Sequence, residues 1–119
     1  MAKGIQTNNG KAFEYACVDS LYRLFSDNQE VVVEESPQLE TARGFFENAP
    51  ADLKESIIKA ADAASRVIVR LEPQLAYPEE NSPLYLSLQT DAKGQAGDVR
   101  DVLCVRNQNG WEVGFSCKH

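Results

Sequence analysis

The sequence predicts an α+β domain in which N-terminal helices pack on an antiparallel meander of three to four strands. Two observations predict this order. Apolar residues recur at intervals of three and four over the first 71 residues, which is the period of helices buried along one face. Beyond residue 83 they alternate with polar residues, which is the period of a half-buried strand. At 119 residues, the chain is expected to form a single domain over residues 1–119.

The first predicted element is a helix that follows a disordered lead-in over residues 1–9, with Asn9 as its N-cap. Its apolar stripe ends near Phe25. After the polar turn 26–29, the β-branched run Val31–Val33 predicts a short strand. The stripe of the helix consists of Phe13, Ala16, Cys17, Ser20, Leu21 and Leu24.

The middle of the chain predicts two more helices. Ser36 and Pro37 form an N-cap followed by a first-turn proline, and they open a helix that runs to about Asn48. Pro50 stops that helix and starts the longest one, which ends before Pro73. The third helix has apolar residues at helical spacing, namely Leu53, Ile57, Ala60, Ala61, Ala64, Val67, Ile68 and Leu71.

Three strands are predicted in the C-terminal third, after a loop that contains three prolines. They cover residues 84–88, 99–106 and 111–118. The turn 107–110 has the sequence Asn-Gln-Asn-Gly, which favours a hairpin between the last two strands. This third of the chain is therefore expected to be an antiparallel meander.

Composition restricts the location of the protein and its partners. There is no apolar run long enough for a membrane span and no signal peptide, so we expect a cytoplasmic protein without a membrane partner. The net charge is −6 and the basic residues are dispersed, so no basic stripe indicates nucleic-acid binding. Cys17, Cys104 and Cys117 lack the spacing of a zinc site and are expected to be reduced and mostly buried.

The chemistry-bearing residues lie at two strand ends. Asp101 stands at the head of an apolar strand, and Lys118 stands at the end of the next one. A hairpin turn at 107–110 would bring these ends together, because paired strands then run antiparallel. A carboxylate that holds a divalent cation beside an ammonium can polarise a phosphodiester and activate water. Asp98 is the alternative acid, although its turn-like surroundings explain an aspartate locally.

An acid on one strand, followed by an acid-x-lysine tripeptide on the next, resembles the PD-(D/E)xK nuclease motif. The sequence departs from this motif at Ser116, where the second acid should stand. Glu112 shares a face with Ser116 but lies roughly 13 Å away along an extended strand. Glu14 on the first helix is the better replacement, although a first-turn glutamate is also stabilised by the helix dipole alone. Lys118 could equally be a solvated lysine that protects a strand edge.

Three segments together resemble the N-terminal part of the HaeIII-type type II restriction endonucleases. They are residues 10–16, 97–103 and 111–119. The resemblance implies an incomplete restriction-endonuclease-like core and Mg²⁺-dependent cleavage of double-stranded DNA at a short GC-rich palindrome. Family members are considerably longer, so the chain would be a fragment, impaired by truncation after the catalytic lysine, whose base-reading part is missing. A homodimer is left open.

The resemblance also implies residue roles. Asp101 and Glu14 would hold the metal, and the backbone carbonyl of Cys117 would add a ligand. Lys118 would stabilise the attacking hydroxide or the pentavalent phosphorane, so the catalytic residues would be Asp101, Lys118 and Glu14.

A non-catalytic protein is the alternative. An acidic α+β module of this size could use an exposed strand edge or a helical face to bind a partner protein. A fragment produced deliberately as a domain would have the same sequence as a natural truncation. The sequence does not indicate a recognition sequence or a cut position.

Overall fold

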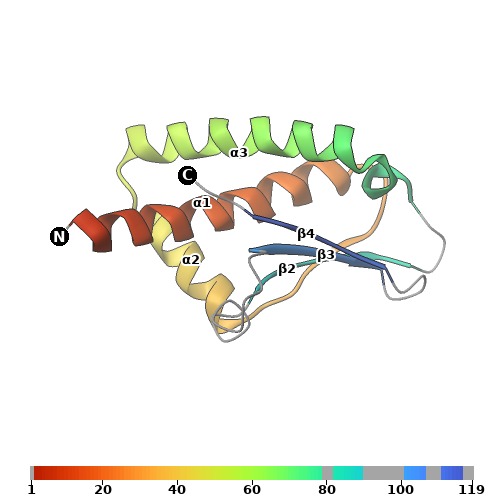
Figure 1. Ribbon diagram of the computed structural model, residues 1–119, viewed down its shortest axis with the longest axis horizontal. Coiled ribbons are helices and arrows are strands. Elements are labelled where there is room, and N and C mark those ends of the chain that lie inside the picture. Colours follow the sequence, from red (N-terminus) through yellow and green to blue (C-terminus); the bar gives the residue numbers. More distant parts are fainter. Residues whose placement is uncertain (1, 79–81, 90–100, 107–110, 117–119) are drawn as a thin grey trace.

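The computed structural model describes residues 2–78, 82–89, 101–106 and 111–116, and it shows three helices packed on a four-stranded mixed sheet (Figure 1). The α+β class is confirmed. Helix α1 lies between α3 and the sheet, and α2 packs against α1 (Figure 1). The elements in chain order are α1 (Ala2–Phe25), β1 (Val31–Val33), α2 (Pro37–Glu47), α3 (Ala51–Leu71), a 3₁₀ turn η1 (Pro73–Ala76), β2 (Leu84–Leu88), β3 (Val102–Arg106) and β4 (Trp111–Phe115).

The strand order is β1-β2-β3-β4. Strands β2, β3 and β4 form the predicted antiparallel meander, in which Cys104 of β3 pairs with Leu86 on one side and Val113 on the other. Strand β1 differs from the prediction, because it pairs with β2 in parallel. The reason is its connection: α2 and α3 carry the chain back across the sheet before β2 begins, as a parallel pair requires.

The core lies between the sheet and α1. Leu84, Leu86 and Leu88 of β2 are buried, while the residues between them are half-buried, so the predicted alternation is confirmed. Leu21 and Phe25 of α1 pack against this face and are also fully buried.

Helix boundaries follow their local signals in two of three cases. The backbone N–H of Leu39 donates to the Ser36 hydroxyl at 3.0 Å, which confirms the predicted N-cap of α2. Helix α3 ends at Leu71, as expected from Pro73. Helix α1 begins at Ala2 instead of after Asn9, and at 24 residues it is longer than α3. Glycine and asparagine lower helix propensity, but unlike proline they keep the N–H donor, so they did not end the helix.

Helices α1 and α3 are joined by a chain of polar groups. The Ser65 hydroxyl donates to the Ser20 oxygen at 2.9 Å, and the Ser20 hydroxyl donates to Asp62 Oδ1 at 2.6 Å. Arg23 Nη2 donates to the same carboxylate oxygen at 3.1 Å. The buried position of Ser20 was predicted from helical spacing, and its hydroxyl is satisfied by α3.

Acid should weaken this helix pair through Asp62. The Ser20 hydrogen bond, followed by Arg23, lowers the pKa of Asp62 below its ordinary value. A carboxylate with a lowered folded-state pKa contributes stability above its unfolded pKa of about 3.9, and this stability is lost as the pH falls below that value. We expect Asp62→Asn to flatten the fall in melting temperature below about pH 4. Circular dichroism melts check this, with Asp27→Asn as the control, because Asp27 is exposed and lines the same surface hollow as Asp62 and Ser20. An unchanged acid limb in Asp62→Asn would contradict it.

Arg106, the last residue of β3, is completely buried. Its Nη1 donates to the Ser82 carbonyl at 2.7 Å, and its Nη2 donates to the Tyr77 carbonyl at 2.9 Å and to Gln29 Oε1 at 2.5 Å. The guanidinium therefore joins β3 to the turn before β1 and to the segment between η1 and β2. From the sequence alone, Arg106 is predicted only as the end of a strand.

Two of the three cysteines fall in the described part of the chain. Cys17 and Cys104 are buried free thiols, as predicted, and burial raises the pKa of Cys104 to about 12. Cys117 lies outside the described residues. No helix of the described ranges is both long and apolar enough to cross a membrane.

Candidate active site

Asp101 lies where the ends of three strands meet. The backbone N–H of Gln89, just after β2, donates to the Asp101 carbonyl at 2.8 Å. The N–H of Asp101 donates to the carbonyl of Phe115, the last residue of β4, at 2.7 Å. The start of β3 and the end of β4 are therefore neighbours, as the hairpin predicted. The main chain of Asp101 is fixed on both sides, and the residue is half-buried.

The pairing changes at this point. In the β3–β4 register Val102 is opposite Phe115, so the bond from Asp101 to Phe115 is offset by one residue from the ladder. Such an offset is typical of a β-bulge, which turns a side chain away from strict alternation and is common beside active sites. The register thus places Asp101 at the end of the sheet and not within its regular surface.

Gln89 is a further residue beside Asp101, and no pattern in the sequence marks it. It follows the last residue of β2, and its backbone N–H donates to the Asp101 carbonyl, so the two residues are direct neighbours at the end of the β2–β3 ladder. Its Nε2 is buried and has no hydrogen-bond partner in the described part of the chain. A buried donor without a partner is rare in proteins and is a candidate to bind a water or an oxygen ligand. Only the strand register reveals this neighbour.

Glu14 lies on the side of α1 that faces the sheet. Val18 and Leu21 follow it by four and seven residues, which places them on the same stripe, and both are buried. Glu14 itself is half-buried. The same part of α1 approaches the end of β4, because Phe13 and Cys17 line a hollow of about 440 Å³ together with residues 114–116. The turn of α1 that carries Glu14 therefore passes near the end of β4.

The remaining candidates divide between the described and undescribed parts. Ser116 is exposed directly after β4, at the end of the strand that adjoins Asp101. Glu112 pairs with Val105, four residues along β3 from Asp101, so it is remote from this strand end. The proposed lysine, Lys118, and the proposed carbonyl ligand of Cys117 lie outside the described residues, and so does Asp98.

The donor chemistry of this strand end suits a hard cation. Asp101 offers carboxylate oxygens, which Mg²⁺ prefers, and Mg²⁺ is usually held by one or two carboxylates together with waters and substrate phosphates. Glu14 is the second carboxylate that the sequence predicts for such a site. No group of three potential metal-ligating side chains exists within residues 2–78, 82–89, 101–106 and 111–116. A Mg²⁺ site here would therefore depend on these two acids and on oxygens that are not acidic side chains.

Comparison with known proteins adds to this geometry. The model of a family described as HaeIII restriction endonuclease matches residues 10–119. The chain belongs to the HaeIII restriction endonuclease family. The matched range contains Glu14, Asp101 and Lys118, and the resemblance noted in the sequence is confirmed at the level of the family.

A relative in the HaeIII family shows how much of an enzyme the chain covers. The chain is 34% identical over 112 residues to the type II restriction enzyme HaeIII of Haemophilus aegyptius. The similarity spans 94% of the chain but only 35% of that enzyme's length. No solved structure matches the chain.

Proposed function

We propose that the chain is the metal-binding part of a type II restriction endonuclease, which hydrolyses phosphodiester bonds of double-stranded DNA. The observation that supports this most directly is the position of Asp101, held between the ends of β2 and β4 in a chain of the HaeIII family. In this proposal Glu14 reaches the same end of the sheet from α1, and the position of the neighbouring Phe13 beside the end of β4 supports this. In this proposal the reaction takes place in the cytoplasm.

Each residue has a distinct role in the proposal. Asp101 and Glu14 hold Mg²⁺, and the Cys117 carbonyl adds a third oxygen. The bound ion supplies Lewis-acid polarisation of the phosphate and lowers the pKa of a water. The ammonium of Lys118 offsets the charge that develops on the phosphate oxygens. The Nε2 of Gln89, beside Asp101, donates a hydrogen bond to a water or to a phosphate oxygen.

The charge and the length of the chain both predict low activity for this polypeptide. With a net charge of −6, the chain offers little attraction to DNA phosphates, which supply most non-specific affinity. The chain spans 35% of the length of the relative, and the proposal gives residues 1–119 no role in base recognition. We therefore expect the chain to bind plasmid DNA weakly and to cleave it poorly. A homodimer is the proposed assembly. Efficient cutting that is lost in Asp101→Ala would refute the expected inactivity and support the site.

Metal binding tests the proposal directly. Calorimetric titration with Mg²⁺ should detect binding to the wild-type chain, and Glu14→Gln should weaken it by roughly tenfold or more, since even outer partners of metal ligands contribute that much. The substitution keeps size and hydrogen-bonding capacity but removes the charge. Glu112→Gln is the matched control, because Glu112 pairs with Val105, four residues along β3 from Asp101. The Mg²⁺ affinity of this variant should equal that of the wild type. A wild-type chain without measurable Mg²⁺ binding would contradict the proposal.

A further inference from the structure

Among the described strands, β1 is the first of the sheet and pairs only with β2, so its other edge is open within this part of the chain. The bonds to β2 come from alternate residues: the N–H of Leu84 donates to the Glu30 carbonyl at 3.0 Å, and the N–H of Glu34 donates to the Leu86 carbonyl at 2.8 Å. In a parallel ladder alternate residues of a strand, here Glu30, Val32 and Glu34, direct their backbone groups to the neighbouring strand. The residues that alternate with them direct their N–H and C=O groups away from it. The backbone groups of Val31 and Val33 therefore point to the open side.

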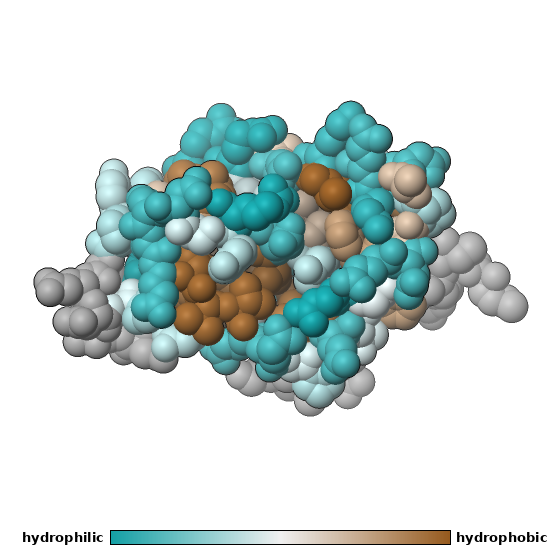
Figure 2. Space-filling view, turned by 180° about the vertical axis from the view of Figure 1, so that it is seen from behind, coloured by the Kyte–Doolittle hydropathy of each residue, from teal (hydrophilic) through white to brown (hydrophobic). Residues whose placement is uncertain are grey.

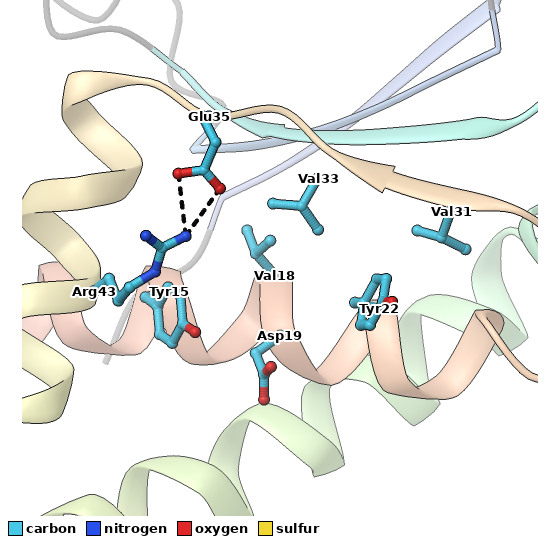
Figure 3. Close-up of a pocket in the computed structure, with 8 residues that line it drawn as sticks. All are labelled: Tyr15, Val18, Asp19, Tyr22, Val31, Val33, Glu35 and Arg43. Carbon is cyan, nitrogen blue, oxygen red and sulfur yellow. Dashed lines mark hydrogen bonds and ion pairs between the residues drawn. The ribbon is translucent and has the colours of Figure 1, made fainter.

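A hollow of about 330 Å³ runs beside this edge, between β1 and α1. The side chains of Val31 and Val33 face it from the strand, and Val18 and Tyr22 face it from the helix (Figure 3). Tyr22 is 41% exposed although it is aromatic. The face of the molecule in Figure 2 shows apolar surface bordered by hydrophilic residues. This hollow can accept an aliphatic side chain next to the strand edge.

One end of the hollow is closed by a fixed ion pair. Both carboxylate oxygens of Glu35 accept hydrogen bonds from Arg43 Nη2, at 2.9 and 3.2 Å (Figure 3). The guanidinium lies over the ring of Tyr15, 5.7 Å from its centroid. The charge of Glu35 is compensated there, so this wall limits the length of an occupant without attracting a charge.

The opposite face of β1 is acidic. Glu30 and Glu34 flank the three valines and are exposed. Strand alternation puts their side chains with Val32, on the face away from the hollow. The open edge of β1 thus has an apolar side and a negative side. Residues of the two sides alternate along β1, as side chains do along any extended strand.

We propose that the open edge of β1 binds an extended segment of a partner protein in which aliphatic side chains alternate with lysine or arginine. The added strand makes main-chain hydrogen bonds to Val31 and Val33, which is the mode of recognition called β-augmentation. Its aliphatic side chains enter the hollow, and its cationic side chains lie across from Glu30 and Glu34.

The charges argue against two other occupants. The exposed carboxylates of Glu30 and Glu34 repel the phosphates of nucleic acid. A second copy of the chain that pairs through its own β1 would place like charges across from one another, which destabilises strand pairing. A basic partner strand has neither penalty.

Two labelled peptides test the proposal by fluorescence anisotropy against the whole chain. One peptide is a capped hexapeptide of alternating lysine and valine, and the other replaces each lysine with glutamate. The first should bind, more weakly as salt increases, and the second should not bind. Equal binding of the two peptides, or no binding of the lysine peptide, would overturn the proposal.

Variants locate the binding site. Val33→Pro removes an outward N–H without removing a bond to β2, and edge strands tolerate proline at such a position. This variant should weaken binding of the lysine peptide by about tenfold or more. The double variant Glu30→Gln/Glu34→Gln leaves the main-chain bonds of the ladder in place and should weaken binding of the lysine peptide by about tenfold. The control Glu40→Gln/Glu47→Gln on α2 should not weaken this binding. Equal losses in both double variants would show an effect of net charge alone and overturn the assignment to β1. Dimerisation of the chain that Val33→Pro abolishes would assign the edge to a second copy instead.

Discussion

Asp101→Asn should remove Mg²⁺ binding from the chain, with an expected loss of affinity of roughly 100-fold or more. Asparagine keeps the shape of the side chain and one oxygen ligand but removes the negative charge that a hard cation requires. The main-chain bonds of Asp101 to Gln89 and Phe115 do not involve the side chain, so the strand ends should keep their positions. Calorimetric titration with Mg²⁺ measures the loss, and circular dichroism checks that the fold is retained.

Asp98→Asn is the control that separates the two acids of this segment. If Asp101 is the metal ligand, this variant should bind Mg²⁺ like the wild type. Loss of binding in Asp98→Asn with retention in Asp101→Asn would transfer the metal to Asp98. Equal binding by the wild type, Asp101→Asn and Glu14→Gln would leave the nuclease site without support and favour the interaction module.

The elements with local signals were predicted from the sequence. Ser36 and Pro37 mark the start of α2, because an N-cap and a first-turn proline act within a few residues. Strands β2 and β3 follow from alternation and from runs of apolar residues. Helical phase predicted most of the buried side of α1, but Leu24 of the predicted stripe is 44% exposed, and Val18 outside it is buried. Glu14 has the same helical phase as Val18 and Leu21.

Features that depend on register across distant segments were not predicted. The parallel pairing of β1 depends on the path of α2 and α3, for which no local signal exists. Gln89 becomes a neighbour of Asp101 only through the β2–β3 register. Arg106 looks like an ordinary polar strand end, because its acceptors lie 24 to 77 residues away in the chain.

The buried guanidinium of Arg106 should be the most sensitive polar site of the fold. Arg106→Met removes the donors to Ser82, Tyr77 and Gln29 and leaves one buried and two part-buried oxygens without this donor, at about 1–3 kcal/mol for a fully buried group. Relief of the desolvation of the charge offsets part of this cost. We expect the free energy of unfolding to fall by about 3 kcal/mol, measured by urea denaturation. Arg70→Met, which removes an exposed charge from α3, should change it by no more than about 0.5 kcal/mol.

Arg106→Lys separates the charge from the geometry. Lysine keeps the positive charge, but a single ammonium cannot reproduce a planar fork that donates from Nη1 and Nη2 to different segments. We therefore expect Arg106→Lys to be nearly as unstable as Arg106→Met, whereas wild-type stability would show that charge alone is sufficient. Arg106 ends the strand whose head adjoins Asp101, so the two substitutions should also differ in kind. Arg106→Lys should lower the fraction of folded chain and leave the Mg²⁺ affinity of the folded chain unchanged. Asp101→Asn should lower the Mg²⁺ affinity and leave the fraction of folded chain unchanged.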